Sequence, residues 1–415
     1  MLIHSASQLI TLTGGPQRGA SFGRLGIIPD GAVLIRGEDI LAVGTTNELS
    51  TAYPNEPTLD AGWKVLMPGF IDPHTHLVWA GNRAAEFELR IQGKTYLEIQ
   101  KAGGGILSTV NATRQATRDH LLVETRQRAN ALFRHGTTTA EAKTGYGLEI
   151  ITELRQLEIL TVLDGEGPLE IVPTFLGAHA IPPEYNNADD YTDFLCQTML
   201  PEVAAWWRSH YPQRPLPFVD VFCDQGAFNL AQARRILETA RSLTFPLKIH
   251  ADEFEALGGA SLAVELGAVS ADHLVKTSIE DIQHLAQSNT VAVSLPCTPF
   301  GLSDSHFTPA RAILEAGGLL AIATDLNPGT AWCENMQFVI ALACRYLRLT
   351  PAEAIVAATI NAAAAIQRQN RVGSIEPGKQ ADLILLTTDD YRHLGYRFGT
   401  NLVSHVIKKG QVYQV

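Results

Sequence analysis

The stretch Leu66-Met67-Pro68-Gly69-Phe70-Ile71-Asp72-Pro73-His74-Thr75-His76 carries the strongest structural signal in this chain. An apolar run, punctuated by two prolines and a glycine, ends in a pair of imidazoles. Side chains two residues apart in extended backbone point to the same side, so His74 and His76 can reach one metal ion. A His-x-His pair is weak evidence on its own, because most such histidines pack in cores or on surfaces. The rest of the sequence must therefore supply the remaining ligands.

The composition indicates a well-buried globular protein, long enough for a large core and more than one folding unit. The 415 residues are 46% hydrophobic and 18% charged, and their net charge is −11. No Lys/Arg cluster is present, which argues against binding to nucleic acid or to anionic membranes. The five cysteines contain no C-x-x-C pair, and no apolar run reaches about 18 residues. We therefore expect a cytoplasmic protein without disulfides, acting on a small molecule.

Strand and helix patterns alternate through the middle of the chain. Eight apolar segments are each followed by a loop and a helical stretch: residues 65–70, 137–142, 171–177, 218–223, 246–250, 269–273, 290–295 and 319–324. Eight βα units over about 300 residues predict an α/β fold of the (β/α)8 TIM-barrel type. The capping box Thr350-Pro351-Ala352-Glu353 predicts an Ala-rich helix over 352–366. We expect the barrel domain to span residues 65–371.

Both ends of the chain are rich in short strands instead. Segments 32–36 and 40–43 flank Gly37-Glu38-Asp39, which is a hairpin pattern. Three further strand-like segments follow near the C-terminus: 382–386, 403–407 and 411–413. We expect residues 1–64 and 372–415 to pair into one small β-sandwich domain.

Polar residues gather where a barrel places its chemistry, at the C-terminal ends of its strands. The candidates are His74 and His76 after the first expected strand, Glu141 and Lys143 at the second, His179 after the third, His250, Asp252 and Glu253 at the fifth, Asp272 and His273 at the sixth, and Asp325 at the eighth. A single strand-end His or Asp more often packs or caps than binds a metal. Four histidines that close three strands, with a fifth after another strand, fit that explanation poorly.

Three imidazoles and one carboxylate suit zinc or iron(II) with one position open for water. A metal lowers the pKa of a bound water to roughly 7 and polarises a carbonyl, which suits hydrolysis or deamination. We expect His273 to orient the water or the substrate carbonyl, and Glu253 to shuttle protons. We expect one zinc or iron ion to be held by four residues: His74, His76, His250 and Asp325.

These features together resemble the amidohydrolase superfamily. The resemblance is carried by the Pro68-to-His76 run, by His250 and Asp325, and by Gly373-Ser374-Ile375-Glu376-Pro377-Gly378-Lys379-Gln380-Ala381-Asp382-Leu383, so it spans nearly the whole chain. It implies a metal-dependent hydrolase barrel with a small β-sandwich built from both termini. It also suggests a homodimer.

Further motifs are similar to one group within that superfamily, whose members hydrolyse the ring amide bond of 4-imidazolone-5-propanoate to N-formimidoyl-L-glutamate in histidine degradation. The motifs begin at His76-Leu77-Val78-Trp79-Ala80-Gly81-Asn82-Arg83, Gly103-Gly104-Gly105-Ile106, Glu141-Ala142-Lys143-Thr144-Gly145-Tyr146-Gly147, Gly177-Ala178-His179, His250-Ala251-Asp252-Glu253-Phe254 and Thr324-Asp325-Leu326-Asn327-Pro328-Gly329-Thr330. Arg83 offers a bidentate fork for the propanoate carboxylate. The resemblance implies contacts to substrate or product by Arg83, Tyr96, Tyr146, His179, Glu253, Asn327, Gly329 and Thr330.

Three alternatives remain open at this point. A deaminase of a nucleobase-like heterocycle would share the metal ligands and would release ammonia. A two-metal cyclic amidase would use a carboxylated Lys143 as a bridging ligand and would hold two ions per chain. A non-catalytic relative of the barrel enzymes would bind neither zinc nor iron.

Overall fold

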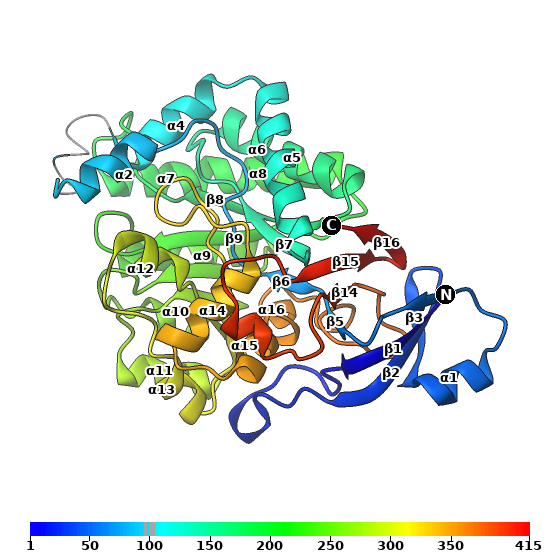
Figure 1. Cartoon of the computed structure of the whole chain (residues 1–415). Helices are drawn as coiled ribbons and strands as arrows, with labels where there is room; N and C mark the ends of the chain where they lie inside the picture. The colour runs from blue at the N-terminus through cyan, green and yellow to red at the C-terminus, as the bar shows by residue number, and fades with distance from the viewer. Residues whose placement is uncertain (95–97, 99–103) are drawn as a thin grey trace.

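The computed structural model describes residues 1–94, 98 and 104–415, and its centre is a ring of parallel strands (Figure 1). Neighbouring strands in this ring follow the order of the sequence. This arrangement confirms the predicted (β/α)8 barrel. The strands are β6 (Phe70–Asp72), β7 (Thr137–Lys143), β8 (Glu170–Ala178), β9 (Phe218–Cys223), β10 (Lys248–Ala251), β11 (Ser270–His273), β12 (Val291–Ser294) and β13 (Leu320–Ile322).

Helices cover the outside of the barrel, so its strands are buried on both faces. All residues of β7 and of β12 are buried, for example. The helices that follow barrel strands or connect them are α2 (Ala84–Ile91), α4 (Ile106–Gln115), α5 (Arg118–Arg134), α6 (Ile150–Glu166), α7 (Ala188–Phe194), α8 (Leu200–His210), α9 (Leu230–Ser242), α10 (Gly259–Leu266), α11 (Ile279–Ala286), α12 (Cys297–Leu302), α13 (Ala310–Glu315), α14 (Met336–Tyr346), α15 (Pro351–Ala357) and α16 (Ile360–Ala364).

The first and last strands of the barrel meet just beyond their C-terminal ends. There the amide of Asp325 donates to the carbonyl of His74 at 3.1 Å, and the amide of His76 donates to the carbonyl of Leu326 at 2.8 Å. Thr75 and Leu326 form an isolated parallel bridge at the same place. The ring is therefore closed at the level of the predicted metal ligands, by their own backbone.

The two ends of the chain form a second, mixed sheet beside the barrel, where the blue and red ends of the chain lie together (Figure 1). Its strands make one continuous hydrogen-bonded sheet, with short helices α1 (Thr46–Ala52) and α17 (His393–Tyr396) nearby in the sequence. The strands are β1 (Leu2–Ile10), β2 (Ile27–Arg36), β3 (Asp39–Thr45), β4 (Thr58–Asp60), β5 (Val65–Pro68), β14 (Leu383–Leu386), β15 (Val403–Lys408) and β16 (Gln411–Gln414).

The predicted first barrel strand, residues 65–70, is wrong in its position. β5 pairs with β1 and β14 in the terminal sheet, and only β6 enters the barrel. The chain crosses between the two sheets at Gly69, whose amide donates to the carbonyl of Asp382. A Cβ atom at residue 69 would lie 2.3 Å from the Thr138 side chain, so glycine is required for this crossing.

The predicted single helix over 352–366 is also wrong, because it is broken into α15 and α16. The capping box at Thr350 begins α15 as expected. Thr359 then leaves the helical region, with φ −132° and ψ −96°. The carbonyl of Ala358 accepts a hydrogen bond from the amide of Ile71 in β6, at 2.9 Å. The break thus supplies a partner to a barrel strand, which no local pattern encodes.

A buried ion pair joins the terminal sheet to the start of β8. Nζ of Lys408 lies 2.6 Å from Asp382 and 3.2 Å from Glu170, whose carboxylate also accepts from Gln380. Burial alone would raise the pKa of Glu170, but Lys408 and Gln380 lower it below its usual value of 4.5. The Glu170 carboxylate therefore stabilises the contact between the two parts of the chain.

Replacing Glu170 by glutamine is expected to lower the free energy of unfolding by about 1 kcal/mol at pH 7. Because the folded-state pKa of Glu170 is lowered, its contribution is present above 4.5 and is lost as the pH falls through the folded value. The difference between wild type and variant should therefore shrink below pH 4.5. Urea titrations at several pH values measure this, and a difference that grows on acidification would contradict it.

Candidate active site

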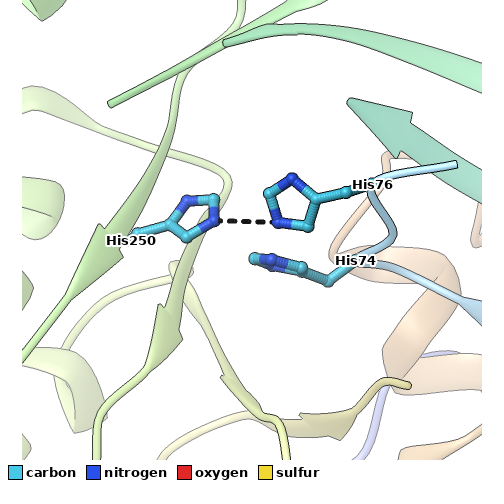
Figure 2. A group of neighbouring side chains, drawn as sticks. All are labelled: His74, His76 and His250. Atoms are coloured by element: carbon cyan, nitrogen blue, oxygen red, sulfur yellow. Dashed lines mark hydrogen bonds between the residues drawn. The ribbon is translucent and has the colours of Figure 1, made fainter. Parts of the chain in front are cut away.

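The four predicted metal ligands converge at the C-terminal end of the barrel. Figure 2 shows the rings of His74, His76 and His250 pointing toward one another. Nε2 of His250 lies 3.4 Å from Nε2 of His76. Oδ1 of Asp325 lies 3.4 Å from Nε2 of His74 and 3.5 Å from Nε2 of His76. All four side chains are buried.

These distances fit a metal ion. Ligand nitrogens about 2.0–2.1 Å from a tetrahedral zinc ion lie roughly 3.4 Å apart. Within the described part of the chain, Nε2 of His74 and Oδ1 of Asp325 are buried without a hydrogen-bond partner, although each faces the cluster. Buried polar atoms in this state are costly unless a ligand satisfies them. The donor set and its spacing therefore suit zinc or iron(II).

Two buried carboxylates orient the imidazoles from behind. Nδ1 of His74 lies 2.7 Å from Oδ2 of Asp272, and Nδ1 of His250 lies 3.0 Å from Oδ2 of Asp220. Burial lowers the pKa of His250 well below its usual value, which keeps this ring neutral. With a carboxylate behind Nδ1, each of the two rings faces the cluster with Nε2. This arrangement is typical of metal-binding histidines.

Asp325 faces the histidines as an ionised carboxylate. Burial alone would raise its pKa, but the neighbouring His74 and His76 rings lower it well below the usual range. Thr298 at the start of α12 donates its hydroxyl to Oδ2. Asp325 has φ +54° and His273 has φ +79°, a left-handed backbone that non-glycine residues rarely adopt. Such strain is concentrated at functional sites.

Glu253 and His273 lie together beside the ligand cluster. Oε2 of Glu253 is 3.5 Å from Nδ1 of His273. Burial, followed by the nearby charges of Asp325 and Asp224, raises the pKa of Glu253 well above its usual value. Burial lowers the pKa of His273 to about 3, so its ring is neutral. A carboxyl group with a raised pKa next to a neutral imidazole is suited to moving protons near neutral pH.

Tyr146 and His179 form the next wall of the site. The ring of His179 stacks on His76 with centroids 4.9 Å apart, and the ring of Tyr146 lies 5.3 Å from His179. Nδ1 of His179 bonds the carbonyl of Gly145 at 3.0 Å, which leaves Nε2 for a ligand. Burial lowers the pKa of His179 to about 3. Both residues therefore present neutral hydrogen-bonding groups beside the metal cluster.

The loop after β13 places the remaining predicted contacts. Asn327 uses its side chain on its own loop: Oδ1 accepts from the amides of Gly329 and Thr330, each at 2.8 Å. Arg83 packs against Gly329, since a Cβ atom built at residue 329 would lie 2.3 Å from Nη1 of Arg83. Tyr96, another predicted contact, lies outside the described residues, as does Gly103 of the glycine motif.

Comparison with known proteins agrees with this geometry. The model of the amidohydrolase family matches residues 229–413. Imidazolonepropionase of Herpetosiphon aurantiacus is 54% identical over 413 residues, covering 99% of this chain and 96% of that protein. Imidazolonepropionase of Chloroflexus aggregans is 50% identical over 417 residues, covering 99% and 98%. The chain belongs to the imidazolonepropionase family.

Solved structures with the same fold share much less sequence identity with this chain. An adenosine deaminase from Xanthomonas campestris with bound zinc has a TM-score of 0.71 at 21% identity, covering 100% of this chain and 92% of its own. A triazine hydrolase variant has a TM-score of 0.76 at 16% identity, covering 99% and 94%. At these identities the similarity supports the fold alone.

A buried ionic network beneath the cluster joins the predicted strand-end residues Glu141, Lys143 and Asp272 to Asp220 and Lys248, which sequence reasoning missed. Nζ of Lys143 lies 2.8 Å from both Glu141 and Asp220, and Nζ of Lys248 lies 3.6 Å from Asp272. Burial alone would lower the pKa of Lys143, but Asp220 and Glu141 raise it above its usual value. Lys143 is thus held as an ammonium among carboxylates. Lys143 thereby supports Asp220 and Asp272, the two carboxylates that lie behind His250 and His74.

Two further carboxylates position two loops of the site, the loop around Tyr146 and the loop that begins at Glu253. Glu153 of α6 accepts hydrogen bonds from the amides of Gly145, Gly147 and Leu148, around Tyr146. Asp224, just after β9, accepts from the amides of Glu253, Phe254 and Glu255 at 2.7, 3.0 and 3.1 Å. Their partners are backbone amides, in the preceding loop for Glu153 and about 30 residues away for Asp224, so no motif signals them. For Asp224, the one available signal in the sequence was its position directly after a strand.

Proposed function

We propose that this chain hydrolyses the ring amide bond of 4-imidazolone-5-propanoate to give N-formimidoyl-L-glutamate, with metal bound by His74, His76, His250 and Asp325. The observation that carries the proposal is the full-length identity of 54% and 50% to two imidazolonepropionases. The buried three-histidine, one-carboxylate cluster supports it, because its geometry suits a metal-dependent hydrolase.

Zinc or iron(II) held by His74, His76, His250 and Asp325 would supply positive charge at the cluster, which acidifies water and polarises a carbonyl group. Asp325 supplies a carboxylate that can accept a proton from the attacking water. The neutral His273 ring lies within the same cluster, where it can donate a hydrogen bond to the carbonyl oxygen as negative charge develops on it.

Glu253 supplies the proton that the leaving nitrogen needs. Water adds its oxygen to the ring carbonyl carbon, the bond from that carbon to the ring nitrogen breaks, and the nitrogen takes up a proton. The raised pKa of Glu253 allows the carboxyl group to hold and release this proton near neutral pH. Its contact with His273 places it at the edge of the cluster.

The propanoate tail is assigned to Arg83, and the ring to Tyr146, His179 and the loop carrying Asn327, Gly329 and Thr330. A guanidinium matches the two oxygens of a carboxylate. Tyr146 lies close enough to Arg83 for that charge to act on its pKa. The rings of Tyr146 and His179 both lie beside the ring of His76. Tyr96 remains assigned as a further substrate contact on the family resemblance.

We further propose one zinc or iron ion per chain, a homodimer, and a cytoplasmic location. Two overlapping three-residue groups, His74, His76 and His250 and His74, His273 and Asp325, share His74, which supports one ion at one place. The five cysteines are all free, in keeping with a reducing compartment. The reaction involves neither nucleic acid nor a membrane surface, and no helix among the described residues is long and apolar enough to cross a bilayer.

The purified protein is expected to consume freshly prepared 4-imidazolone-5-propanoate with stoichiometric appearance of N-formimidoylglutamate. A chelator should abolish turnover, and added zinc or iron(II) should restore it, because the cluster is otherwise unsatisfied. Ring absorbance and mass spectrometry follow the reaction, and elemental analysis counts the metal. Ammonia release from a nucleobase panel without imidazolone turnover would favour a deaminase, and two ions per chain would favour the two-metal amidase.

A further inference from the structure

We infer that Glu86, on helix α2, is a positioning residue that aims the Arg83 guanidinium at the substrate carboxylate. The inference rests on the proposed function, in which Arg83 binds the propanoate tail. Glu86 lies outside every motif that pointed to the site. Its carboxylate nevertheless connects Arg83 to a second segment of the chain.

The contact between the two residues uses one edge of the guanidinium. Nε of Arg83 donates to Oε2 of Glu86 at 2.8 Å, and both side chains are largely buried. Among the described residues, Arg83 hydrogen-bonds through Nε alone. The Nη groups are therefore left to receive a ligand, and the planar guanidinium is fixed in orientation by the bond at its other edge.

The second oxygen of Glu86 is anchored to the backbone of another element. Oε1 accepts from the amide of Gly105, at the start of α4, at 2.9 Å. It also accepts from the hydroxyl of Ser108 at 3.2 Å. Both oxygens of Glu86 are thus engaged, one by Arg83 and one by α4. A carboxylate held from both sides cannot rotate away without breaking bonds to both.

A second arginine fixes the surface on which Arg83 lies. Nη1 of Arg83 occupies the space where a side chain at residue 329 would stand, so this contact requires Gly329. The carbonyl of Gly329 accepts from Nη2 of Arg90, one turn beyond Glu86 on α2, at 2.9 Å. From one helix, Glu86 therefore holds Arg83 and Arg90 holds the backbone of Gly329, against which Arg83 packs.

The chemistry predicts a defined kinetic signature. The tail lies away from the bond that breaks, so its recognition stabilises the bound substrate and the transition state about equally. Loss of such uniform binding raises KM and leaves kcat nearly unchanged. Glutamine at residue 86 would keep the size of the side chain but remove the charge that holds the guanidinium.

The test compares wild type, E86Q and E88Q on 4-imidazolone-5-propanoate and on its propanamide analogue, which lacks the tail charge. E86Q should raise KM for the propanoate about tenfold, with kcat within about threefold of wild type. KM for the propanamide should be unchanged by E86Q. Glu88 is exposed on the same helix and contacts Gln92, so E88Q is the matched control and should behave as wild type.

A double-mutant cycle separates positioning from general damage to the helix. If Glu86 acts through Arg83, then E86Q should add no further increase in KM once R83A has been made. An unchanged KM for the propanoate in E86Q, or full additivity with R83A, would overturn the inference. Equal turnover of propanoate and propanamide by the wild type would instead overturn the assignment of Arg83 to the tail. Equal melting temperatures of the variants confirm that each is folded.

Discussion

Replacing Glu253 by glutamine is expected to lower kcat by about 10²- to 10⁴-fold, the usual contribution of a general acid–base group. Glutamine has a similar shape but cannot carry the proton that the leaving nitrogen takes up. Because Glu253 is not one of the four clustered donors, the variant should bind metal as the wild type does. The limb of the pH–rate profile that reports Glu253 should disappear. Steady-state kinetics and elemental analysis measure these outcomes.

The neighbouring Glu255 provides the control for this variant. Its side chain is exposed, and only its backbone amide contacts Asp224. Glu255→Gln should therefore retain wild-type kinetics. Full activity in Glu253→Gln would remove Glu253 from the mechanism. Loss of metal from that variant would show that its role is structural, since a proton carrier has no part in holding the ion.

Replacing Asp272 by asparagine is expected to weaken metal binding by about 10- to 100-fold, as is usual when the partner of a ligating histidine is removed. Burial alone would raise the pKa of Asp272, but Lys248 and His74 lower it, so the residue is a carboxylate in the folded protein. Its loss leaves Lys248 and Lys143 with less compensation inside the barrel. The free energy of unfolding should fall by about 3–5 kcal/mol.

A buried pair in the terminal sheet gives the matched control. Asp382 and Lys408 form a similar contact at 2.6 Å, away from the ligand cluster. Asp382→Asn should lower stability to a similar extent and leave metal affinity unchanged. Competition with a chelator of known affinity measures binding, and urea titration measures stability. Wild-type metal affinity in Asp272→Asn would show that the carboxylate does not orient His74.

The convergence of the four proposed metal ligands was predictable because the barrel topology converts sequence position into spatial position. His74, His76, His250 and Asp325 each stand at or just after a strand end, and parallel strands bring all such ends to one face. The pattern needed no knowledge of contacts between distant residues. The structure places these four side chains together as expected.

The errors arose where a distant segment decides local structure. The strand predicted at 65–70 divides at Gly69, because β5 finds its partners at the two termini and β6 finds its partner in β7. The helix predicted at 352–366 breaks so that Ala358 can accept a hydrogen bond from β6. Asp224 escaped notice for the same reason, since it bonds to the backbone of a remote loop.

The closure of the barrel makes the predicted coordination site depend on the last barrel strand, β13. Ligands on one side of the cluster follow the first barrel strand, and Asp325 follows the last, with their amides and carbonyls bonded to one another. During synthesis the coordination site is therefore incomplete until β13 has emerged and found β6. An ion bound by His74, His76, His250 and Asp325, as proposed, would connect the two sides of the junction at which the ring would otherwise open. Metal uptake would then report that the last step of barrel assembly has taken place.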